Sequence, residues 1–276
     1  MNTSHELKFE SPSFTKRIKG MLGVDFYRLF HTPLFYIFLG IAAIIPAMLI
    51  AMTGMTGPDG TPSEPLFNNV WQAIAADAPI YGFKGIDKYA NMNMVFIFGG
   101  IMVSIFIGHD YKSGYVKQLF TTHAKKEDYM ISKSLTCAFA MACMCVTYLF
   151  GAVVAGALTQ TSFAVNIGNL VFAVLGKMAM SLGWASLYTF LNVVFRRYFG
   201  VSIASSFFFG TGILIIGIAS AIGEGALLNV FLYGASVFAC LSATPVTLLV
   251  CLAVSIVWAV AYNVIGSLLL YNCDVY

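Results

Sequence analysis

The chain has 276 residues, of which 59% are hydrophobic and 10% are charged, and its mean hydropathy is +0.83. Soluble globular domains carry about 25% charged residues, so this composition excludes an ordinary soluble domain and indicates an integral membrane protein. The net charge of +3 is small, so the positions of Lys and Arg are more informative than their sum. The length leaves room for one membrane domain with short loops.

Residues 1–33 are expected to form a cytoplasmic segment ahead of a membrane domain over 34–276. The stretch "FTKRIKGMLGVDFYRLFHTP" places apolar side chains at helical spacing, with its cations largely on the other face. Those apolar residues are Phe14, Ile18, Met21, Leu22, Phe26, Leu29 and Phe30. This pattern predicts an amphipathic helix in the headgroup layer, bending at Pro33 into the first span. A basic tail that only sets topology is the alternative. We expect no cleaved signal peptide, so the first span would act as a signal-anchor.

Six apolar segments are long enough to cross roughly 30 Å of hydrocarbon as helices, which predicts an all-α membrane protein with six transmembrane helices. They cover 34–53, 92–108, 134–158, 168–194, 199–222 and 246–270. A further apolar stretch at 226–241 has only 16 residues. A re-entrant or interfacial outer hairpin before the sixth span is favoured there. A short seventh span, which would leave the C-terminus outside, is the alternative.

Lys and Arg are distributed unevenly between the two predicted sides of the membrane. Residues 1–33 hold five, the 109–133 loop holds five, and the turn after the fourth span holds Arg196 and Arg197. The opposite side holds only Lys84 and Lys88, beside several acids. Cytoplasmic loops are enriched in Lys and Arg. We therefore expect a multi-pass cell-membrane protein with its N-terminus, its 109–133 loop and, for six spans, its C-terminus in the cytoplasm.

The 109–133 loop is itself patterned. In "YKSGYVKQLF" one helical face is apolar while the lysines lie elsewhere, and "KKEDYMISK" then restarts a helix with acids in its first turn. The apolar face consists of Tyr115, Val116, Leu119 and Phe120. A short amphipathic helix between two spans is suited to docking on a cytoplasmic partner. The alternative is a solvated loop that only fixes topology.

The layout resembles the permease of a bacterial type-2 ATP-binding-cassette (ABC) exporter, with an interfacial helix, six spans and a charged loop after the second span. In that family an acid ends span two, a Gly follows four residues on, a Leu-rich turn comes next, and a basic stretch leads to a Lys at the head of span three. The matching positions are Asp110, Gly114, Leu119, Lys125 and Lys133. The family's Pro is absent, and "TTHAKK" stands in its place.

The resemblance implies that residues 112–122 form a coupling helix seated on an ATPase subunit. The residues expected to couple are Asp110, Lys112, Gly114, Tyr115, Leu119, Phe120 and Lys125. The sequence has no G-x-x-x-x-G-K-[ST] loop, so ATP and Mg²⁺ would be bound by a separate dimer of ATPases. A second permease, identical or not, and membrane lipid are the other expected partners, and no nucleic acid is expected. The expected cargo is hydrophobic or amphipathic, such as an antimicrobial peptide, a drug or a lipid, which would link the chain to efflux and antimicrobial resistance.

Lys177 is the one Lys, Arg, Asp or Glu well inside a predicted span. A cation at that depth is costly, so it is expected to face the interior, a cavity or a partner, and it is a candidate for the translocation pathway. Snorkelling or a structural pairing is the alternative. The four His and six Cys form no metal-binding or catalytic motif. We therefore expect that this chain binds no cofactor and no metal and is not itself an enzyme. An ion-coupled secondary transporter and a non-transporting scaffold or sensor remain the alternative functions.

Overall fold

The computed structural model of the chain describes seven segments, and among them it contains helices and no strand. These segments are residues 13–51, 69–74, 92–121, 124–164, 166–212, 230–241 and 244–272. Five of the helices are long and apolar enough to cross a membrane, as expected for a multi-pass membrane protein. They are α2 (Pro33–Ala51), α4 (Met94–Lys112), α6 (Lys126–Leu158), α7 (Ile167–Val194) and α11 (Pro245–Asn272).

The remaining described helices are shorter. They are α1 (Phe14–His31), α3 (Val70–Ile74), α5 (Tyr115–Thr121), α8 (Phe199–Gly210) and α10 (Leu232–Leu241). The 12 residues of α8 cover the first half of the predicted span 199–222. The part of that predicted span from 213 onward lies outside the described residues. The 10 residues of α10 extend about 15 Å at 1.5 Å per residue, which is half of a bilayer core.

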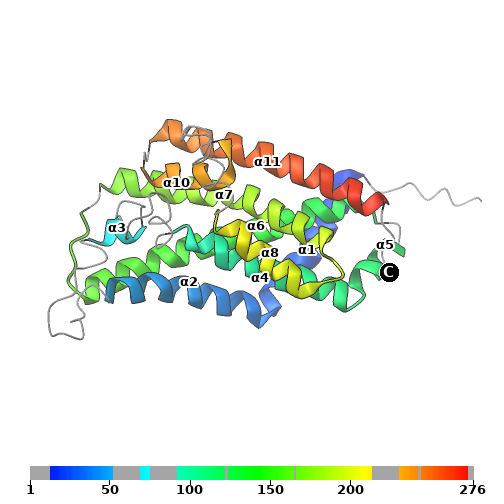
Figure 1. Cartoon of the computed structure of the whole chain (residues 1–276), viewed down its shortest axis with the longest axis horizontal. Coiled ribbons are helices and arrows are strands. Elements are labelled where there is room, and N and C mark those ends of the chain that lie inside the picture. Colours follow the sequence, from blue (N-terminus) through cyan, green and yellow to red (C-terminus); the bar gives the residue numbers. More distant parts are fainter. Residues whose placement is uncertain are drawn as a thin grey trace, which may run out of the picture.

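The long helices run side by side, with α7 packed between α6, α11 and α4 (Figure 1). On the other side of α6 lies α2, and the two backbones approach closely at Gly151, where a Cβ atom would come within 2.1 Å of the Ala43 carbonyl oxygen. Small residues at such crossings allow membrane helices to pack tightly. The side of α11 away from α7 carries exposed apolar residues, which suits a hydrocarbon environment: Leu249, Ile256, Val257, Val260 and Val264.

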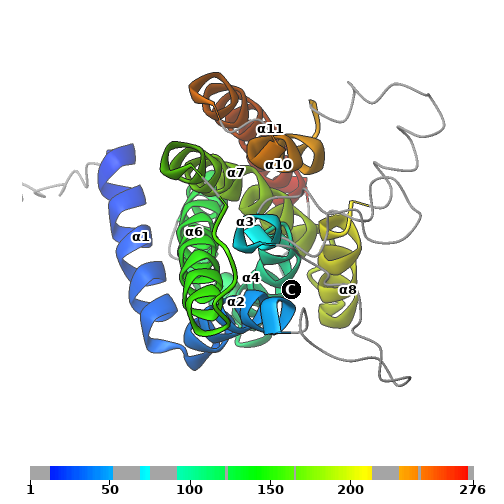
Figure 2. The same cartoon turned by 90° about the vertical axis from the view of Figure 1, so that its left-hand side faces the viewer.

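The predicted amphipathic helix is present as α1, and it lies across the direction of the long helices (Figure 2). It packs on α6, with Leu29 buried and Phe26 in edge-to-face contact with Phe139 at 5.2 Å. Phe14 and Phe30 of its predicted apolar face are 53% and 42% exposed. Helix α1 therefore divides its apolar side chains between the bundle and its surroundings.

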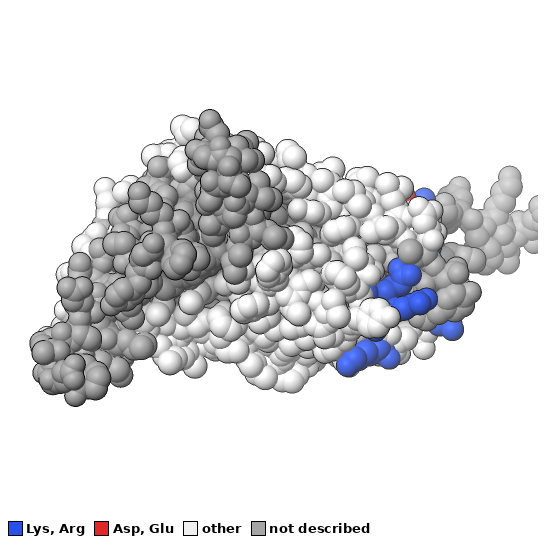
Figure 3. Space-filling view, viewed as in Figure 1, with Lys and Arg blue, Asp and Glu red and all other residues white. Residues whose placement is uncertain are grey.

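On the face drawn in Figure 3, the Lys and Arg side chains of the described residues gather at one end of the bundle, which we call the basic end. The C-terminal end of α11 meets the start of α6 there, because Lys126 Nζ donates to the Leu270 carbonyl oxygen at 2.5 Å. Nearby, Arg17 of α1 pairs with Asp128 of α6 at 2.6 Å. Helix α1, the loop between α4 and α6, and the end of α11 therefore share one end of the molecule.

Candidate functional site

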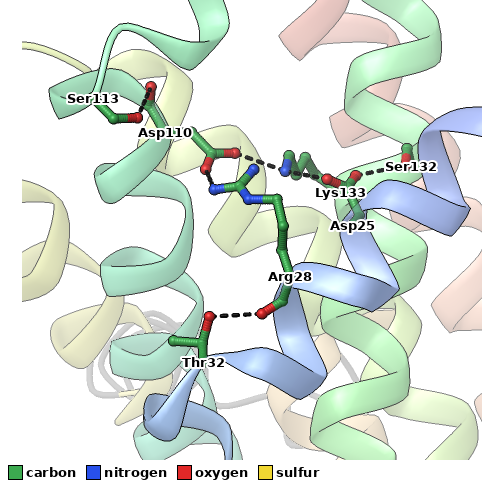
Figure 4. Close-up of polar contacts among 7 residues, drawn as sticks. All are labelled: Asp25, Arg28, Thr32, Asp110, Ser113, Ser132 and Lys133. Carbon is green, nitrogen blue, oxygen red and sulfur yellow. Dashed lines mark hydrogen bonds and ion pairs between the residues drawn. The ribbon is translucent and has the colours of Figure 1, made fainter.

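A buried ionic cluster at the basic end joins α1, α4 and α6 (Figure 4). It consists of Asp25, Arg28, Asp110 and Lys133. Lys133 Nζ lies 2.5 Å from Asp25 Oδ1 and 2.6 Å from Asp110 Oδ2. Arg28 donates to the other oxygen of Asp110, and Ser132 Oγ donates to Asp25 Oδ2 at 2.7 Å. One lysine thus connects an acid on the crosswise helix with an acid at the end of α4.

The ionic cluster is balanced in charge, and three of its four side chains are closed to solvent, whereas that of Arg28 is 25% exposed. The side chains of Asp110 and Lys133 are 0% exposed and that of Asp25 is 2% exposed. Burying charges costs several kcal/mol for each ion unless each one is paired and hydrogen-bonded. Two acids facing two bases meet that condition, so the three helices hold a fixed relation to one another as long as all four groups are present.

Aromatic rings enclose the cations of the ionic cluster. The Arg28 guanidinium lies 4.5 Å from the centre of the Tyr115 ring, and Lys133 Nζ lies 5.1 Å from that of Phe106. Burial opposes the charge on Arg28, but the hydrogen bond and the attraction to Asp110 outweigh it, so the pKa of Arg28 is raised above its ordinary value. Arg28 consequently stays charged at any physiological pH.

Helix α5 follows a turn at Gly114, whose φ of +72° is one that glycine adopts at little cost. Its buried face rests on the ends of the long helices, with Val116 among residues of α6, α7 and α11: Tyr129, Met130, Val193 and Leu270. Phe120 packs edge to face on Tyr129 at 5.7 Å. The opposite face is polar and exposed, and consists of Lys117, Gln118 and Thr121.

The structure places the seven predicted coupling residues in four different settings. Asp110 belongs to the ionic cluster, and Tyr115 packs against its Arg28. Leu119 and Phe120 are half-buried against the apolar residues under α5. Gly114 forms the turn, whereas Lys112 and Lys125 are exposed. Most of the predicted set therefore positions α5 rather than covering its outer face.

Three members of this site, Asp25, Arg28 and Ser132, are not among the site residues predicted from the sequence. A signal for Asp25 was present, because it lies midway between Met21 and Leu29 on the apolar face of α1. An acid at that position needs a buried partner when the face is packed. Nothing comparable marks Ser132, which is one of two serines near the start of α6.

Lys177 lies in the interior between α7 and α4, as expected for a cation at that depth. Its side chain is 0% exposed, its Nζ donates to Asn93 Oδ1, and the Phe96 ring centre is 5.7 Å away. In this conformation Lys177 is a packed, hydrogen-bonded group and does not line an open passage.

Among the described residues, no three His, Cys, Asp or Glu side chains lie close enough together to hold a metal ion. Comparison of the sequence with protein-family models and with curated proteins finds no match. The functional argument therefore depends on the residues of this chain and their arrangement.

Proposed function

We propose that the chain is the permease subunit of an ABC exporter, with α5 as the helix through which a separate ATPase acts. The observation that carries the proposal is the construction of α5, a seven-residue helix between two spans with one face anchored in the bundle and the other exposed and polar. A helix that only marked topology would not need a buried anchor. A helix that receives force from a partner does.

The contacts of α5 give it a route into the membrane domain. A push on its exposed face would pass through Val116 to α6, α7 and α11. It would also pass through Tyr115 to Arg28 and the rest of the ionic cluster, and so to α1 and α4. Closure of two ATPases around ATP and Mg²⁺ would in this way tilt the spans of two permeases, identical or not, about a shared pathway.

The remaining features of the proposal concern topology and cargo. The chain would span the bacterial cell membrane six times, with α8 continuing as the fifth span and α10 belonging to a re-entrant outer hairpin. The basic end would face the cytoplasm, because it holds most of the Lys and Arg. A hydrophobic or amphipathic substrate, such as an antimicrobial peptide, fits described spans in which the cation deep within a helix, Lys177, is already hydrogen-bonded.

The exposed face of α5 provides the test. The variant Lys117→Glu/Gln118→Glu changes two exposed residues, whereas changes at Leu119 or Phe120 would also disturb packing. A pull-down of the chain from native membranes in mild detergent, followed by mass spectrometry, should recover an ATPase with a phosphate-binding loop. The α5 variant should lose that ATPase while inserting normally.

The matched control is Lys16→Glu/Lys19→Glu, which changes two exposed residues of α1 at the same end of the molecule. It should retain the ATPase. A wild-type chain that purifies without any ATPase, or an α5 variant that keeps it, would contradict the proposal and favour a secondary transporter or a scaffold.

A further inference from the structure

Three cations gather where α4 ends and where the chain turns from α7 into α8. Lys112 is the last residue of α4, and Arg196 and Arg197 form the turn before α8. None of the three forms an ion pair with an acid in the described segments, in contrast to Arg17, Arg28 and Lys133. We call these residues the basic triad. Its charge is available to a ligand.

The basic triad lines a small hollow of about 60 Å³. Asn192 and Ser202 also line it, but the Ser202 hydroxyl donates to Asn192 Oδ1 and the Asn192 amide donates to Ser104 Oγ and the Tyr188 carbonyl oxygen, so the free donors come from the cations. Phe199 lies under Lys112 with the ring centre 4.1 Å from Nζ. Helix α8 begins at the same place without a side-chain cap on its first turn, so its backbone N–H groups add partial positive charge. A volume near that of a phosphate group, bordered by three cations and the first turn of a helix, is suited to one anion.

Arg196 and Arg197 also line a second and larger hollow, of about 380 Å³. Its other walls are mostly apolar and come from the ends of α7 and α11 and the residue before α8: Val193, Val194, Leu269 and Tyr198. Val194 is 44% exposed and Tyr198 is 66% exposed. Exposed aliphatic residues beside an exposed tyrosine are typical of the boundary between hydrocarbon and headgroups.

The two hollows together match an amphipathic anion. Guanidinium groups bind phosphate oxygens through paired hydrogen bonds, and the neighbouring apolar walls can hold the start of an acyl chain. An acidic protein surface would match the three cations but not the apolar hollow beside them.

We propose that the basic triad binds the phosphate of an anionic phospholipid from the membrane leaflet at the basic end. The lipid's acyl chains would begin along Val194 and Leu269. This site is separate from the exposed face of α5, and the inference does not depend on the proposed transport function.

The experiment measures binding of a fluorescent phosphatidylglycerol to the purified full-length chain in a neutral detergent. The variant Arg196→Gln/Arg197→Gln should bind it at least about tenfold more weakly, because each cation near an anionic lipid contributes on the order of a fivefold change in affinity. Arg196→Lys/Arg197→Lys should recover part of the loss. The matched control, Lys16→Gln/Lys19→Gln, removes the same charge from exposed positions of α1 and should bind like the wild type.

Competition identifies the source of the phosphate. Unlabelled phosphatidylglycerol should displace the probe, whereas phosphatidylcholine and millimolar inorganic phosphate should not. Displacement by inorganic phosphate alone would assign the pocket to a free anion and overturn the lipid proposal. Equal losses of affinity in the glutamine variant and the control would mean that binding depends only on net charge, which would also overturn the lipid proposal. A third result would also overturn the lipid proposal: Arg196→Gln/Arg197→Gln binds the lipid as the wild type does but no longer retains an ATPase. The basic triad would then belong to a protein interface.

Discussion

Lys133 pairs with both Asp25 and Asp110, and so links the acids of two helices. We predict that Lys133→Met lowers the free energy of unfolding by about 3–5 kcal/mol, since it leaves two buried carboxylates facing only Arg28. Thermal unfolding of the purified chain in detergent measures the loss. Lys19→Met, at an exposed position on α1, is the control and should change stability by less than about 0.5 kcal/mol.

A compensating variant separates charge balance from lost packing. Asp25→Asn/Lys133→Met removes one charge of each sign and leaves the Arg28–Asp110 pair. It should regain about half or more of the stability lost in Lys133→Met, as coupled residues do in a double-mutant cycle. A double variant less stable than either single variant would show that the cluster is not held by its charge balance.

Only part of the ionic cluster could be predicted from the sequence. Asp110 and Lys133 match positions of a family motif, and the resemblance implies a role in coupling for Asp110. Their contacts with Asp25 and Arg28 could not be predicted, because these depend on how α1 packs across the bundle. Lys177 was correctly expected to face inward, since a cation at mid-span has few other stable positions.

At the scale of elements, hydropathy predicted which segments span the membrane better than it predicted where helices begin. The third span was predicted over 134–158, but α6 begins at Lys126. Its first turns are polar and lie at the basic end, so a hydropathy pattern does not register them. Helix α5 was predicted from its apolar face, and that face is the one packed in the bundle. Its outer surface, Lys117, Gln118 and Thr121, was not singled out, because polar residues carry no periodic signal of their own.

The crossing of α2 and α6 depends on the absence of one side chain. At Gly151 a Cβ atom would lie 2.1 Å from the Ala43 carbonyl oxygen, which is backbone and cannot rotate away. We predict that Gly151→Ala pushes the helices apart and costs about 1–3 kcal/mol. The loss should appear as a lower unfolding temperature in detergent.

The same helix pair offers the control for this prediction. A Cβ atom added at Gly40 on α2 would have no neighbouring atom within 4 Å, so Gly40→Ala should be neutral or stabilising by up to about 1 kcal/mol through helix propensity. Equal effects at the two glycines would mean that propensity, and not the close approach at Gly151, decides the outcome.

For the whole molecule, composition and the distribution of Lys and Arg predicted a multi-pass helical protein, and the five long apolar helices confirm that class. Charge counting left the side of the C-terminus open, because no Lys or Arg follows Arg197. The contact between Lys126 and the Leu270 carbonyl relates the end of α11 to the rest of the bundle. It places the end of α11 at the same end as the start of α6, whichever way the bundle is oriented.

Cysteine labelling separates that relation from the absolute orientation. In a cysteine-free background, Lys125→Cys and Asn272→Cys lie at the two ends joined by this contact, and Gln160→Cys lies in the turn between α6 and α7. We predict that a membrane-impermeant maleimide labels Gln160→Cys in intact cells and the other two only after permeabilisation, because the Lys- and Arg-rich side faces the cytoplasm. If all three positions exchange sides, the orientation is wrong but the fold stands. If Lys125→Cys and Asn272→Cys label from opposite sides, the packing of α11 against α6 is itself wrong, because residues at one end of a bundle cannot face two compartments.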